Sequence, residues 1–116
     1  MARKTAGRKP QAGAAAPPVQ MPRIDRLVHE PARLLILMTL AVVEQADFLF
    51  VMSQTGLTFG NMSSHTTKLE AAGYVAVEKQ FVDKKPNTVL QLTDAGRAAL
   101  EGYQQQMRGI LDHGAG

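Results

Sequence analysis

The segment Thr58-Phe59-Gly60-Asn61-Met62-Ser63-Ser64-His65-Thr66-Thr67-Lys68-Leu69-Glu70-Ala71-Ala72-Gly73-Tyr74-Val75 predicts a helix followed directly by a strand. Thr58 can cap the helix, because its hydroxyl accepts a hydrogen bond from a free N–H group of the first turn. Met62, Leu69 and Ala72 then fall on one face at helical spacing, and Gly73 can end the helix. From Tyr74 the apolar residues change to the period of a strand. The predicted helix covers residues 58–72.

Two further helices are expected before this one. Pro31 suits the first turn of a helix, where its missing N–H costs nothing, and an apolar segment follows it over 31–43. A helix that is apolar almost all round lies at the centre of a small domain or in a dimer interface. Asp47 is expected to cap a second helix over 48–55, and Gly56 to end it in the left-handed conformation.

Two strands and a last helix are expected after it. The apolar residues within 74–82 and 88–92 predict two strands, and the polar segment 83–87 between them predicts a hairpin tip with two lysines. Thr93-Asp94 is expected to cap the last helix. The short Gly56-Leu57 connection makes the second and third helices cross steeply, as in a helix-turn-helix unit. The sequence therefore predicts a mainly α fold with a small β-hairpin, a winged helix-turn-helix domain.

Three motifs resemble those of MarR/ArsR-like winged-helix regulators. They are the Ser, His and Leu pattern of 58–75 with its Leu-Glu-x-x-Gly, the segment Leu92-Thr93-Asp94-Ala95-Gly96-Arg97, and Ile24 to Pro31 with Arg33, which is similar to a small single-domain group. The resemblance spans residues 24–107 and implies a DNA-binding domain. Thr66 stands where these proteins usually have an aliphatic residue, so its hydroxyl needs a helical carbonyl or water. The wing tip also carries lysines without the arginine that usually enters a minor groove.

The positive charge of the chain is concentrated at its N-terminus. The sequence has 13 Lys and Arg against 10 Asp and Glu, but residues 1–23 hold five basic and no acidic side chains, so the remaining 93 residues carry a net −2. A tail rich in Ala, Gly and Pro is expected to be disordered, and its charge suggests a polyanionic partner. A solubilising or cloning-derived leader is the alternative. We divide the chain into this basic tail, 1–23, and a winged helix-turn-helix domain, 24–116.

The outward face of the third helix is expected to read DNA. It carries short donors and acceptors with a single acid, and Asn, Ser, Thr and Lys are side chains that contact bases and phosphates. The hairpin lysines would lie along the sugar–phosphate backbone. The alternatives are a solvated helix face and an ordinary solvated turn. The candidate DNA-binding residues are Thr58, Gly60, Asn61, Ser63, Ser64, His65, Thr67, Lys68, Lys79, Lys84, Lys85, Asn87 and Thr88.

The last helix is expected to mediate dimerisation. Four of its apolar residues are spaced 3, 4 and 3 apart, as in the seam of a short coiled coil, and an N-terminal turn could complete a two-fold interface. Packing of the stripe back onto the core of its own chain is the alternative. The candidate interface residues are Ile24, Leu27, Val28, Leu100, Tyr103, Met107, Ile110 and Leu111.

The sequence excludes several functional classes. Without Cys there is no disulfide, thiolate metal site or Cys nucleophile, and His29, His65 and His113 belong to separate elements, so no metal site is expected. No catalytic motif is present, so we expect neither an enzyme nor a cofactor. The longest apolar run, 34–43, is too short to cross a bilayer, and a cytoplasmic protein associated with the nucleoid through DNA is expected.

Two functions are compatible with these observations. The first is a bacterial-type homodimeric transcriptional regulator that binds double-stranded DNA, with the third helix, 58–72, in the major groove and the wing, 82–88, on the backbone or in the minor groove. A small-molecule effector that changes DNA affinity is compatible with it, and the sequence identifies none. The second is a winged helix for protein–protein contact, with the tail as a nonspecific basic anchor.

Overall fold

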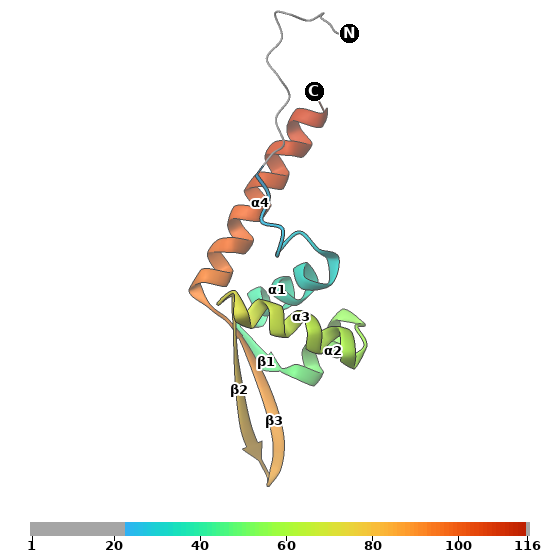
Figure 1. Ribbon diagram of the computed structural model, residues 1–116, viewed down its shortest axis with the longest axis vertical. Coiled ribbons are helices and arrows are strands. Elements are labelled where there is room, and N and C mark those ends of the chain that lie inside the picture. The colour runs from blue at the N-terminus through green and yellow to red at the C-terminus, as the bar shows by residue number, and fades with distance from the viewer. Residues whose placement is uncertain (1–22, 116) are drawn as a thin grey trace, which may run out of the picture.

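The computed structural model describes residues 23–115, so the predicted tail lies outside the described residues except for Arg23. The helices α1–α3 form the body of the domain, the β2–β3 hairpin extends from it in one direction, and α4 extends in the opposite direction (Figure 1). The predicted mainly α fold with a small sheet is confirmed. The elements are α1 (Pro31–Val43), β1 (Gln45–Asp47), α2 (Phe48–Thr55), α3 (Phe59–Ala71), β2 (Val75–Val82), β3 (Lys85–Leu92) and α4 (Asp94–Ala115).

The core forms around α1, as its apolar sequence predicts. Ile36, Leu37 and Leu40 of this helix are fully buried. Every other helix and both long strands contribute to the same cluster, because each presents one apolar face to α1 or to its neighbours. The further buried members of the cluster are Val28, Val51, Met62, Leu69, Val75, Leu90, Leu92, Leu100 and Tyr103.

Local side-chain hydrogen bonds set the ends of the helices. Thr58 Oγ1 accepts from the Asn61 N–H at 3.2 Å, and Thr93 Oγ1 accepts from the Gly96 N–H at 2.9 Å, so both predicted caps are confirmed. Gly56 ends α2 with a φ of 74°. Asp47 is at the N-cap of α2, but its side chain makes no capping bond there.

The sheet differs from the predicted two-stranded hairpin. Its order is β1-β3-β2, and the unpredicted β1 pairs with β3 from Gln45↔Gln91 to Asp47↔Val89. The hairpin turn is also shorter than expected. It consists of Asp83 and Lys84 alone, with φ values of 52° and 66°, and the segment 85–87 belongs to β3. The inner face of α3 differs at one position, since Ala72 is exposed; Thr66 is buried on this face, as expected.

Candidate nucleic-acid interface

The outer face of α3 presents short polar side chains to solvent. Thr58, Gly60, Asn61, Ser63, Ser64, Thr67 and Lys68 are exposed along this helix. Its only acidic residue, Glu70, lies near the far end. The N-terminal half of the face is therefore uncharged and rich in hydrogen-bonding groups, a composition that suits contact with base edges and phosphates.

His65 is the one predicted residue of α3 whose side chain turns toward the body. It lies between α3 and the beginning of α1, where its Nδ1 is 3.1 Å from Arg33 Nη1 and its Nε2 is 4.0 Å from Glu30 Oε2. Because the guanidinium only donates, Nδ1 accepts and the Nε2–H is directed to the carboxylate. Arg33 Nε also donates to the Leu27 carbonyl oxygen at 2.5 Å. This cluster fixes the position of α3 on α1.

Glu30 joins this cluster to the N-terminus of α1. Its Oε1 accepts from the Arg33 N–H at 2.8 Å and so caps the helix. Partial burial acts to raise the pKa of Glu30, but the bond from the Arg33 N–H, the electrostatic attraction of the His65 imidazole and the charge of Arg33 outweigh it, and the pKa is held below its ordinary value.

A second carboxylate, Asp25, ties the segment before α1 to the end of α3. Its Oδ1 accepts from the N–H groups of Leu27 and Val28 at 2.9 and 3.2 Å. Its Oδ2 accepts from the Tyr74 hydroxyl at 2.7 Å, and this bond, with burial and the charge of Asp25, raises the pKa of Tyr74. Segment 24–30 therefore holds the junction between α3 and β2 in place.

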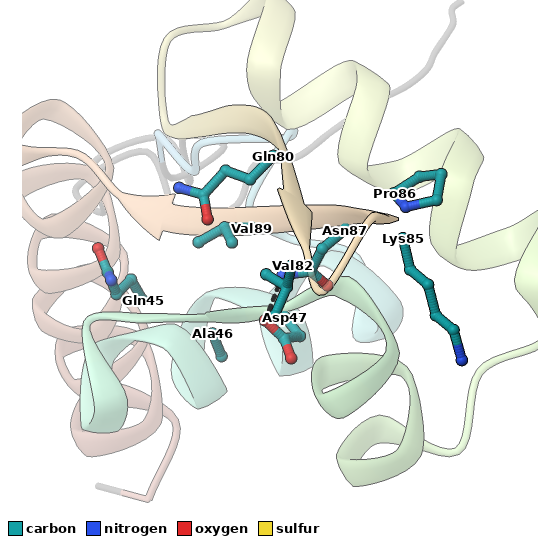
Figure 2. A pocket seen from close by; sticks show the side chains of 9 residues that line it. All are labelled: Gln45, Ala46, Asp47, Gln80, Val82, Lys85, Pro86, Asn87 and Val89. Carbon is teal, nitrogen blue, oxygen red and sulfur yellow. Dashed lines mark hydrogen bonds between the residues drawn. The ribbon is translucent and has the colours of Figure 1, made fainter.

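The β2–β3 hairpin carries exposed cations. Lys79, Lys84 and Lys85 are exposed, and Lys79 lines a cleft beside α3. Asn87 and Thr88 are half-buried, and the Asn87 Nδ2 donates to Asp47 Oδ1 at 3.1 Å across a shallow hollow between β1 and β3 (Figure 2). This bond joins β3 to the last residue of β1, which is also the N-cap of α2, and it engages the Asn87 amide within the chain.

A cleft joins α3 to one face of the wing. Ser63, Thr66 and Thr67 line it from α3, and Lys79 and Thr88 line it from the strands. The buried Thr66 Oγ1 has no hydrogen-bond partner among the described residues, so the helical carbonyl, one of the two partners expected for it, is not used. The structure thus brings Ser63 and Thr67 of α3 together with Lys79 and Thr88 of the hairpin, whereas Lys85 and Asn87 line the hollow on the opposite face of the hairpin.

The predicted dimer residues fall into two groups. Val28, Leu100 and Tyr103 are buried in the core of their own chain, and the Tyr103 hydroxyl is 2.8 Å from His29 Nδ1. For these three residues the alternative of packing on their own core applies. Partly buried or exposed side chains remain for a partner, namely Ile24, Leu27, Met107, Ile110 and Leu111.

Sequence reasoning missed two exposed aromatic residues on this side. Phe59 is 64 % exposed and stacks at a tilt on Phe48, with ring centroids 5.3 Å apart, and Phe81 is 78 % exposed near the wing tip. Strand alternation would have placed Phe81 on the core-facing side of β2 but beyond the end of the core.

Within residues 23–115, no three His, Asp or Glu side chains are grouped to hold a metal ion. Nor does any helix there have both the length and the apolar character needed to cross a membrane.

Comparison with known proteins gives concordant results. The family described as winged helix DNA-binding domain matches residues 32–111. An uncharacterised protein of Methanocaldococcus jannaschii is 30 % identical over 78 residues, covering 67 % of this chain and 85 % of that protein. The structure of a transcriptional regulator homologue from Pyrococcus horikoshii OT3 aligns with a TM-score of 0.72 and 30 % identity, over 76 % of this chain and 87 % of that one.

A structure solved with DNA shows the same fold. A mutant MarR from E. coli, complexed with operator DNA, aligns with a TM-score of 0.56 and 19 % identity, over 71 % of this chain and 64 % of that one. The family match and the relative from M. jannaschii each cover about two thirds of the chain. The chain therefore belongs to the winged helix DNA-binding domain family, and its fold is that of the MarR-like transcriptional regulators.

Proposed function

We propose that this protein is a homodimeric transcriptional regulator that binds double-stranded DNA sequence-specifically. The observation that carries the proposal is the outer face of α3, which presents uncharged hydrogen-bonding groups along its N-terminal half beside the β2–β3 hairpin with its three exposed lysines. In this arrangement α3 enters the major groove with its N-terminal residues on the base edges, and the wing, 82–88, follows the backbone or the minor groove.

Two residues of α3 have different roles in this proposal. Asn61 is exposed in the first turn, where its amide can pair bidentately with an adenine. Lys68 is exposed in the last turn and is placed to contact a phosphate. Family membership supports DNA as the partner, and so does the E. coli neighbour, which was solved with its operator.

Dimerisation through α4 is the second part of the proposal. The second half of this helix extends beyond the body (Figure 1), and a groove beside it is lined by Leu34, Met38, Met107 and Leu111. Two copies related by a two-fold axis would cover these side chains and present two α3 helices to successive major grooves. A small-molecule effector is compatible with this function, and we assign it no residues.

A comparison of Asn61→Ala with Lys68→Ala tests the DNA-binding proposal. The operator is first identified by selection. The full chain binds duplexes from a random pool in the presence of excess nonspecific competitor. We expect Asn61→Ala to weaken the free energy of binding to the selected duplex by about 1–3 kcal/mol. We also expect it to relax the sequence preference at one base pair. Lys68→Ala is expected to weaken binding to selected and to random duplexes about equally. If both variants bind like the parent, α3 does not read DNA, and failure to select any duplex favours protein–protein contact instead.

A further inference from the structure

Exposed apolar residues flank the charged turn at the tip of the wing. Phe81 is 78 % exposed and Val82 is 50 % exposed, and Phe81 pairs across the hairpin with the exposed Pro86. The tip is also the end of the molecule that lies farthest from α4 (Figure 1). Lys84 and Lys85 adjoin this apolar group, and no arginine is present in the wing.

Phe81 faces the same side of the domain as the cleft beside α3. Successive side chains of a strand alternate between its two faces, so Phe81 shares a face with Val77 and Lys79 of β2. Val77 packs against the core, and Lys79 lines the cleft opposite Ser63 and Thr67 of α3.

The charge on this face of the wing has one sign. Lys79 is the single charged side chain on it among the residues of β2 and β3. The two acids of the hairpin lie elsewhere, since Glu78 points to the opposite face and Asp83 is in the turn. A cation, an aromatic ring and Pro86 are therefore aligned outward along one face, next to the candidate reading surface of α3.

The hairpin that carries Phe81 is a stiff support. β2 and β3 pair in unbroken register over eight residues each, from Val75↔Leu92 to Val82↔Lys85, and a two-residue turn closes them. The Asn87–Asp47 bond also fastens the wing to the body. An exposed ring at the end of such a support is held ready for contact, so binding costs little ordering entropy.

We propose that Phe81, backed by Pro86, inserts as an apolar wedge between two base pairs from the minor groove and kinks the duplex. The inference rests on the proposed DNA-binding function and identifies how the wing engages DNA without an arginine. Apolar side chains, Phe and Pro among them, unstack base steps when they enter the minor groove. Burial of the ring between bases offsets the loss of stacking. Lys84 and Lys85 hold the phosphates on either side, and Lys79 lies on the backbone next to α3.

A wedge of this kind selects DNA by deformability. Pyrimidine–purine steps such as TA and CA/TG unstack most easily, so they are favoured under the wing although no hydrogen bond reads them. The contribution of Phe81 is also independent of salt, because the ring displaces no counterions.

The test compares Phe81→Ala with Phe81→Leu and Val42→Ala on one selected duplex. Leu keeps an apolar wedge, and Val42 is a matched control because it is an apolar residue of α1 with 83 % exposure. Energy transfer between dyes at the two ends of the duplex reports the kink, and titration reports the affinity. We expect Phe81→Ala to straighten the bound duplex and to weaken binding about ten-fold, or about 1.4 kcal/mol. Phe81→Leu retains most of the kink, and Val42→Ala behaves like the parent.

The dependence on salt separates the ring from the lysines. Phe81→Ala leaves the slope of log K against log salt unchanged, whereas Lys84→Ala lowers its magnitude by about 0.9. A parent chain that binds straight DNA, or a Phe81→Ala variant that kinks it as the parent does, overturns the wedge while DNA binding stands. A Phe81→Ala variant that changes the oligomeric mass but not the kink assigns the tip to protein contact. A full chain that selects no duplex overturns the proposed function, and the wedge with it.

Discussion

Gly96, in the first turn of α4, shows how close packing selects a single residue type. A Cβ built there would overlap the carbonyl oxygen of Tyr74 and lie 2.9 Å from Leu92 Cδ1. We expect Gly96→Ala to lower the free energy of unfolding by about 1–3 kcal/mol, because backbone has to move to accept the methyl group. Denaturant unfolding measures the loss.

Gly102, also in α4, is the matched control. A Cβ there would have no neighbouring atom within 4 Å. Gly102→Ala is expected to stabilise the chain by about 0.5–1 kcal/mol, since alanine restricts the unfolded backbone and suits a helix interior. A gain in stability for both variants would show that helical propensity, and not contact with Tyr74, decides the effect of alanine at position 96.

Glu30 gives the stability of the domain a dependence on acid pH. Its folded-state pKa is lowered, so its carboxylate stabilises the fold above the ordinary pKa of a glutamate, and this contribution is lost as the pH falls through the folded-state value. We expect Glu30→Gln to lower the free energy of unfolding by about 0.3–1 kcal/mol at neutral pH, because a charge at the N-terminus of α1 is removed. The difference from the parent disappears in acid.

Thermal unfolding of the parent and of Glu30→Gln across a pH series measures this effect. Glu101→Gln is the control, because Glu101 is an exposed carboxylate of α4. A Glu30→Gln variant that loses as much stability in acid as at neutral pH would show that the carboxylate acts through its shape and not through its charge.

The two halves of α4 differ in burial. Leu100 and Tyr103, in the first half, lie in the core of the chain, whereas Leu111, in the second half, is 64 % exposed. Tyr103→Glu is therefore expected to destabilise the fold itself, by about 3 kcal/mol or more, because it buries a charge and loses the bond to His29.

Leu111→Glu is expected to leave the fold intact and to reduce the dimer to a monomer. Light scattering measures the mass, and circular dichroism confirms that the helices are retained. An unchanged dimer mass would place the interface away from the second half of α4. A monomeric parent would contradict the dimer altogether.

The elements that the sequence predicted well are those with local signals. Pro31, Gly56 and Thr93 mark helix ends through their own backbone and side-chain geometry, and the structure places those ends where expected. β1 has no such signal, since it consists of three residues that become a strand only by pairing with β3. The length of the hairpin turn was missed because Lys85 and Asn87 are polar but pair fully with β2.

The candidate site was predictable where it depends on one helix face. The outward residues of α3 follow from helical periodicity, and the structure exposes all of them except His65. The exceptions depend on contacts between distant segments. His65 is held by Arg33 and Glu30, and Tyr103 is held by His29, so their inward positions could not be derived from their own elements.

On the scale of the whole molecule, charge is divided unequally between the tail and the domain. Residues 1–23 carry +5 and the remainder carries −2, so we expect the tail to supply much of the long-range attraction to DNA. Five cations per protomer that neutralise phosphates set a ceiling of roughly 4–5 on the change in the slope of log K against log salt. Deletion of 1–23 should flatten this slope and slow association, while the preference for operator over random DNA persists.

Titrations at several salt concentrations measure the effect of this deletion. The undeleted chain on the same duplexes is the reference. An identical slope after deletion would show that the tail is a passive leader, and that Lys68, Lys79, Lys84 and Lys85 supply the ionic contacts alone.

The short β1 strand leaves the outer part of β3 unpaired on one edge, since its pairing stops at Val89. Alternate residues of β3 point their backbone N–H and C=O groups toward that edge. Leu92 is one of them, since its N–H donates to the Glu44 carbonyl oxygen. Near the tip, the residue of β3 whose backbone points to the unpaired edge is Pro86, which has no N–H group. The opposite edge of the hairpin is β2, which carries Lys79 midway along its length. Proline and lysine are the residues that keep free strand edges from recruiting strands of other molecules. The hairpin extends into solvent, and these residues protect it against edge-to-edge aggregation in the unbound protein.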